Sequence, residues 1–137
     1  MFKVLFGGSI IAVLMFSPVM ANTPVLSGKY AFSSVVNCGS AGSGVSQTSG
    51  LLTFDPTAGT VSIVGNVIDG DPPVMRSTVA TVSFSNTSGT ITVNGVTYQA
   101  TFGKLSRGIA TYLTYIGVYS QDGHACGAEG WLSRRGA

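Results

Sequence analysis

The sequence predicts an all-β fold, an antiparallel up-and-down meander of about eight strands that closes into a small barrel. Three observations favour it. Apolar and polar residues alternate in short runs, and clusters of Gly, Ser, Asn, Asp and Pro separate these runs. No stretch has the i, i+3, i+4 apolar spacing of an amphipathic helix. Because a meander of this length must hide its edges by closing or by adding a second layer, a two-sheet β-sandwich is the alternative.

The alternation places the strands in chain order. The expected strands span 28–36, 50–55, 60–68, 77–85, 90–94, 96–102, 109–119 and 126–134. In the first, Tyr30 and Phe32 share one face, and in the sixth Tyr98 and Phe102 do so. The seventh is apolar on both faces, which predicts either a strand buried on both sides or a bulge near Gly117.

One turn is defined more sharply than the others. Asn94-Gly95 lies between two alternating runs, and this dipeptide favours a type I′ hairpin turn, which needs positive φ at both positions. The turn ends the second copy of a repeat, in which residues 54–65 match 84–95 in the pattern F-x-x-T-x-G-T-[VI]-[ST]-[IV]-x-G. Two copies predict a repeated hairpin, since a solenoid needs at least three units.

The first 21 residues have the three parts of a secretory signal peptide. Lys3 supplies a positive charge, residues 4–16 are apolar, and small residues precede a cleavage site after Ala21. A transmembrane helix needs roughly 20 apolar residues, and Pro18 interrupts this stretch. We therefore expect a signal peptide over 1–21, a single β-barrel-like domain over 22–137, and a secreted or periplasmic protein with no membrane span after cleavage.

The two cysteines, Cys38 and Cys126, both lie in the exported part. Two cysteines in an exported protein predict a disulfide bond rather than a metal site or a nucleophile. In an up-and-down meander the connections alternate between the two ends of the barrel, which places both cysteines at the same end. The bond is therefore expected to join the first hairpin loop to the last strand.

The same topology gathers opposite charges at the two ends. A weak polar cluster is expected at the disulfide end: Asp69, Asp71, Asp122 and His124. Basic residues dominate the other end: Lys29, Lys104, Arg107, Arg134 and Arg135. The cluster is either a site for a polar ligand or ordinary solvated loop charge. We predict no metal, because the Asp-Gly-Asp stretch at 69–71 lacks the further ligands of a calcium loop.

The Tyr-rich segment 112–119 suggests a ligand surface. Tyr112, Tyr115, Tyr119 and Trp131 are candidates for an aromatic platform that binds carbohydrate or a protein partner, since such side chains offer an apolar body and a polar tip. The alternative is that these residues belong to an ordinary buried strand.

Sequence motifs for catalysis or cofactor binding are missing from the chain. It has no G-x-S-x-G motif, no zinc-ligand set and a single histidine. We therefore expect no enzymatic activity and no cofactor. Without Lys3, six Lys and Arg residues face five Asp and Glu residues, a balance that does not indicate nucleic-acid binding.

Ser27-Gly28-Lys29-Tyr30 resembles the G-x-W opening of lipocalins, with Tyr in place of Trp. The terminal-region disulfide and the basic Arg134-Arg135 are similar too. The resemblance implies a calycin-like barrel with an apolar ligand in its mouth. More generally, the chain looks like the small exported β-proteins of bacteria.

Two functions are therefore expected. The first is a barrel at the cell envelope that binds a small apolar ligand, a carbohydrate or a protein surface, and it predicts a closed monomer with an internal pocket. The second is an adhesive or pilin-like structural subunit, and it predicts an open groove and polymerisation.

Overall fold

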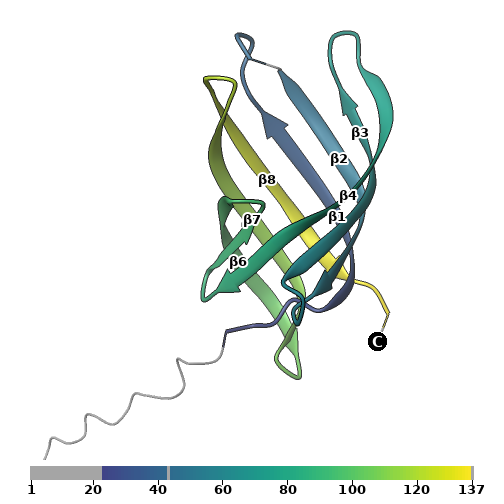
Figure 1. Cartoon of the computed structure of the whole chain (residues 1–137), viewed down its shortest axis with the longest axis vertical. Coiled ribbons are helices and arrows are strands. Elements are labelled where there is room, and N and C mark those ends of the chain that lie inside the picture. The colour runs from purple at the N-terminus through teal and green to yellow at the C-terminus, as the bar shows by residue number, and fades with distance from the viewer. Residues whose placement is uncertain (1–22, 43, 137) are drawn as a thin grey trace, which may run out of the picture.

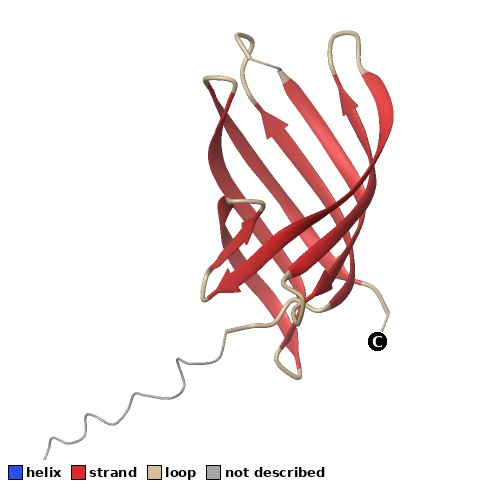
Figure 2. Ribbon diagram, in the orientation of Figure 1, coloured by secondary structure: helices blue, strands red, loops and turns tan. Residues whose placement is uncertain are grey.

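The structure, a computed structural model, describes residues 23–42 and 44–136. Eight antiparallel strands form a closed barrel in meander order (Figure 2). They are β1 (Gly28–Asn37), β2 (Val45–Asp55), β3 (Thr60–Asp69), β4 (Val74–Thr87), β5 (Thr90–Val93), β6 (Val96–Ser106), β7 (Ile109–Gln121) and β8 (His124–Arg134). The predicted barrel is confirmed and the sandwich alternative is wrong. The predicted signal peptide lies outside the described residues, and within the described ones no helix is long and apolar enough to cross a membrane.

Several strands are longer than the alternation indicated. β2 begins at Val45 instead of residue 50, and its pairing with β1 continues to the Asn37–Val45 pair. Residues 45–49 are mostly polar, so they carry no apolar pattern. Their backbone nevertheless completes the ladder with β1, because a strand whose outer face meets water can be built from Ser, Thr and Gln.

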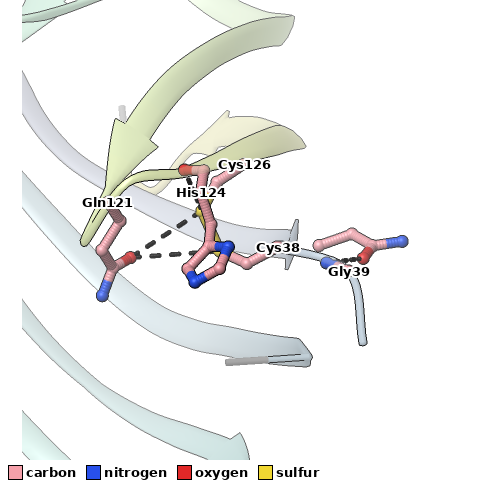
Figure 3. The surroundings of a disulfide bond; sticks show 6 residues. Cys38, Gly39, Gln121, His124 and Cys126 are labelled. Carbon is pink, nitrogen blue, oxygen red and sulfur yellow. Dashed lines mark hydrogen bonds between the residues drawn. A yellow bond between two sulfur atoms is a disulfide. The ribbon is translucent and has the colours of Figure 1, made fainter. Parts of the chain in front are cut away.

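The disulfide lies at the seam where the first and last strands meet. Asn37 pairs with Gly127, and Cys38 and Cys126 follow as the next opposed pair, with Cα atoms 4.1 Å apart. Both cysteines are buried. This confirms the predicted bond and its place beside the first hairpin loop (Figure 3). At the other end of the seam, the Arg135 N–H donates to the Lys29 carbonyl oxygen at 2.8 Å.

Buried apolar side chains close the end of the barrel opposite the disulfide. Residues 38–42, 70–73 and 122–123, which follow β1, β3 and β7, lie at the upper end in Figure 1, and residues 23–27 cross the lower end. Leu26 of that segment is fully buried, and Val25 forms a parallel bridge with Ile109. The two copies of the repeat meet here, where Phe54 and Phe84 pack edge to face with ring centroids 4.9 Å apart.

Tyr30, from the lipocalin-like opening, is fully buried at the same end. Its hydroxyl donates to the Ala110 carbonyl oxygen at 2.6 Å. Arg134 Nε donates to the Ser27 carbonyl oxygen at 2.9 Å, so the residues that carry the resemblance meet in space.

The two repeats diverge at their last residues, and as a result the barrel wall is shorter at β5 than elsewhere. Gly65 lies inside β3, whereas Asn94 and Gly95 form the predicted turn, with φ of 49° and 84°. β5 therefore has only four residues. β4 pairs with it through 84–87 alone, and residues 74–83 pair only with β3.

Candidate functional site

An apolar cavity of about 190 Å³ lies inside the barrel. Its walls are the inward-facing residues of the strands, which the alternation had placed on one face. They include Phe32, Val36, Leu52, Ile63, Val93 and Leu132. Ser34 and Thr48 are its only lining residues with aliphatic hydroxyl groups, so the cavity suits an apolar guest.

Two tyrosines supply the other polar atoms of the cavity. Tyr98 and Tyr115 pack edge to face with ring centroids 5.4 Å apart. Burial raises the pKa of Tyr98 to about 12, and the neighbouring Tyr115 and Tyr119 add to the rise. Burial likewise raises the pKa of Tyr115, and a hydrogen bond with Ser34 opposes the rise in part. Both phenols are therefore neutral at physiological pH and can donate a hydrogen bond to an oxygen atom of a ligand.

Two inward-facing glycines, Gly117 and Gly130, leave the space that the rings of Tyr98 and Tyr115 occupy. A Cβ atom on Gly117 would lie 2.6 Å from Cδ1 of Tyr98, and one on Gly130 would lie 2.6 Å from the Tyr115 hydroxyl. The rings can therefore lie against the wall, which leaves the centre of the barrel unfilled.

Both alternatives expected for the seventh strand are wrong. The pairing of β7 with β8 runs through Gly117 without a shift, so there is no bulge in it. The strand is not buried on both sides either, because the outward Ile116 and Val118 are exposed. The register shifts of β7 lie instead in its pairing with β6, between Phe102 and Leu105.

The four residues of the predicted aromatic platform do not form one surface. Tyr115 lines the cavity, and Tyr119 lies four residues further along β7 on the same face. Tyr112 and Trp131 are on the outside, with 41% and 39% of their surface exposed. The sequence hid this division because the outward residues Ile116 and Val118 are apolar as well.

The predicted polar cluster lies at the mouth of the barrel without converging on one point. Asp69 ends β3 and forms an ion pair with Arg76. Asp71 and Asp122 lie in the turns that follow β3 and β7, and His124 begins β8. Within the described residues, no group of three or more His, Cys, Asp or Glu side chains could hold a metal ion.

His124 and Gln121 flank the disulfide at this mouth (Figure 3). The Gln121 Oε1 atom lies 4.0 Å from the sulfur of Cys38 and 4.0 Å from that of Cys126. The polar residues thus surround the rim, while the chemistry of the interior is apolar.

Comparison with protein-family models gives no match to this chain, and comparison with curated proteins gives no match either. What the chain is shown to share with lipocalins is therefore the architecture alone, an eight-stranded antiparallel closed barrel.

Proposed function

We propose that this protein is exported and binds a small apolar ligand in the interior cavity of its barrel. The observation that carries the proposal is the apolar cavity itself, bounded below by the packed end and lined by two neutral phenols. An apolar pocket takes up apolar molecules that match its size, as an engineered apolar cavity takes up benzene.

The volume limits the ligand. An engineered cavity of about 150 Å³ holds benzene, so about 190 Å³ suits a monocyclic aromatic compound or a short acyl chain. One oxygen on the ligand could accept from Tyr98 or Tyr115. Burying roughly 200 Å² of ligand surface contributes about 5 kcal/mol, which corresponds to a Kd of about 0.2 mM before any hydrogen bond is counted.

The compartment is part of the proposal. The leader-like residues 1–21 support export, and the Cys38–Cys126 bond supports an oxidising location, either secreted or periplasmic. The short side of the wall at β5 offers a route by which a ligand can enter the barrel.

Calorimetric titration with p-cresol and with octanol tests the proposal. We expect saturable binding of at least one of them by the wild type and its loss in Ala128→Leu, because Ala128 is buried and lines the cavity. Ala125→Leu is the matched control, because Ala125 lies exposed on the same strand. Binding that survives Ala128→Leu, or no binding of either compound, would overturn the proposal.

A second candidate function, an adhesive or pilin-like subunit, is favoured by one observation. Residues 74–83 of β4 pair with β3 alone, and Val79 on this stretch is 76% exposed. A free strand edge can accept a strand from another chain. Light scattering distinguishes the two functions: a mass that rises with concentration supports the subunit, and a constant monomer mass supports the ligand carrier.

A further inference from the structure

A second concavity, of about 460 Å³, lies on the outer face of β6, β7, β8 and β1. The register aligns its side chains in two rows across these strands. The first row is Thr101, Thr114, Trp131 and Ser33, and the second is Gln99, Ile116, Glu129 and Val35. We call this concavity the outer groove.

The polar side chains of the outer groove have no hydrogen-bond partner within the described residues. Some facing polar side chains elsewhere on the barrel bond to each other, as Thr92 does with Thr97 at 2.9 Å, and others, such as Ser62 and Thr81, do not. Thr101 and Thr114 belong to the second kind, since they face each other and no side-chain hydrogen bond joins them. These groups are therefore free to bond to a ligand.

The outer groove combines an aromatic plate with hydrogen-bonding groups of both kinds. The indole of Trp131 is 39% exposed and offers an apolar surface with one N–H donor. Glu129 lies two residues before Trp131 on β8, in the second row. Its carboxylate can accept hydrogen bonds and has no ion-pair partner among the described residues. Gln99 adds an amide that can both donate and accept.

We propose that the outer groove binds the pyranose ring of a neutral saccharide. A pyranose presents a patch of C–H groups on one face and hydroxyl groups around its edge, and the groove offers the complement of both. The C–H face stacks on Trp131, while ring hydroxyls donate to Glu129 and exchange hydrogen bonds with Gln99. The volume leaves space for more than one ring.

Two other occupants fit the outer groove less well. A quaternary ammonium ion favours several aromatic faces around it, whereas this groove presents one exposed ring, Trp131. The core of a protein interface is depleted of Glu and Ser, whereas the outer groove carries Glu129 and Ser33.

The test uses Trp131 as its own reporter, since it is the only tryptophan in the chain. Cellotetraose, maltotetraose and chitotriose are titrated into the purified protein while tryptophan emission is followed. We expect a saturable blue shift with at least one of them and a Kd of about 1–10 mM, as a small exposed site allows. Glu129→Gln should raise that Kd at least fivefold, and Gln99→Ala at least twofold.

Matched controls separate the site from general effects. Asp122→Asn and Gln47→Ala alter an exposed acid and an exposed amide away from the groove and should leave the Kd unchanged. Ala128→Leu, which fills the interior cavity, should also leave it unchanged, so failure of the cavity proposal and failure of this one are distinguishable. The absence of a saturable shift up to about 50 mM of each saccharide, equal binding by Glu129→Gln, or saturation by choline in place of saccharide would each overturn the proposal.

Discussion

Removing the disulfide is the sharpest test of how the barrel is closed. The bond joins residues 88 apart in sequence, so the unfolded chain loses much of its freedom when the bond is present. The chain-entropy model assigns roughly 4–5 kcal/mol to a loop of this length. The double variant Cys38→Ala/Cys126→Ala should therefore lose roughly that free energy of unfolding, and Tm should fall by about 15 °C. Alanine avoids placing a free thiol or hydroxyl at these buried positions.

Urea unfolding followed by circular dichroism measures the loss. With a slope of about 1–2 kcal/mol per M, the midpoint should fall by roughly 2–5 M. Reductant should destabilise the wild type by a similar amount and leave the double variant unaffected. A loss below about 1 kcal/mol would mean that the β1–β8 ladder holds the seam without the bond.

Three further predictions concern single residues. Tyr30→Phe should lower the free energy of unfolding by about 1–3 kcal/mol in urea titrations, because the Ala110 carbonyl loses a buried donor at 2.6 Å. Tyr98 should ionise near pH 12 in absorbance titrations at 295 nm; since its pKa in the fold lies above the ordinary value of 10, its contribution to stability is complete below pH 10 and is lost as pH rises from 10 to 12. Gly117→Ala should weaken ligand binding in the calorimetric assay at least fivefold, because the new methyl group displaces the Tyr98 ring toward the cavity.

Each of these has a control. Tyr112→Phe changes a half-exposed tyrosine and should alter stability by less than about 0.5 kcal/mol. Tyr98→Phe should remove the absorbance step near pH 12 and part of the alkaline loss of stability. Gly127→Ala, at an outward position with open space around it, should leave ligand binding unchanged. Equal effects in a variant and its control would contradict the corresponding prediction.

The fold was predictable because its determinants are local. Alternating residues such as Tyr30 and Phe32 mark one face of a strand, Asn94-Gly95 marks a turn, and the meander then places both cysteines at one end. The polar start of β2 was missed because Ser, Thr and Gln carry no apolar alternation, although their backbone pairs fully with β1.

The sites were less predictable because they depend on which residues face each other across strands. The cavity depends on Gly117 lying beneath Tyr98 and on Gly130 lying beneath Tyr115, and these contacts require the register of β6, β7 and β8. Trp131 was identified from its residue type alone. Glu129 lies two residues from it on β8, but Gln99 lies on β6, and only the paired register of β6, β7 and β8 places it in the same groove.

Methyl-resolved NMR shows whether the interior of this barrel binds a ligand. During titration with p-cresol and then octanol, the methyl signals of Leu52, Ile63 and Leu132, which line the cavity, should shift and saturate together. The signals of the outward-facing Val64 and Val79, which are 52% and 76% exposed, should stay in place. Shifts confined to the outward-facing methyl groups, or no shifts with either compound, would show that the interior is not a binding site.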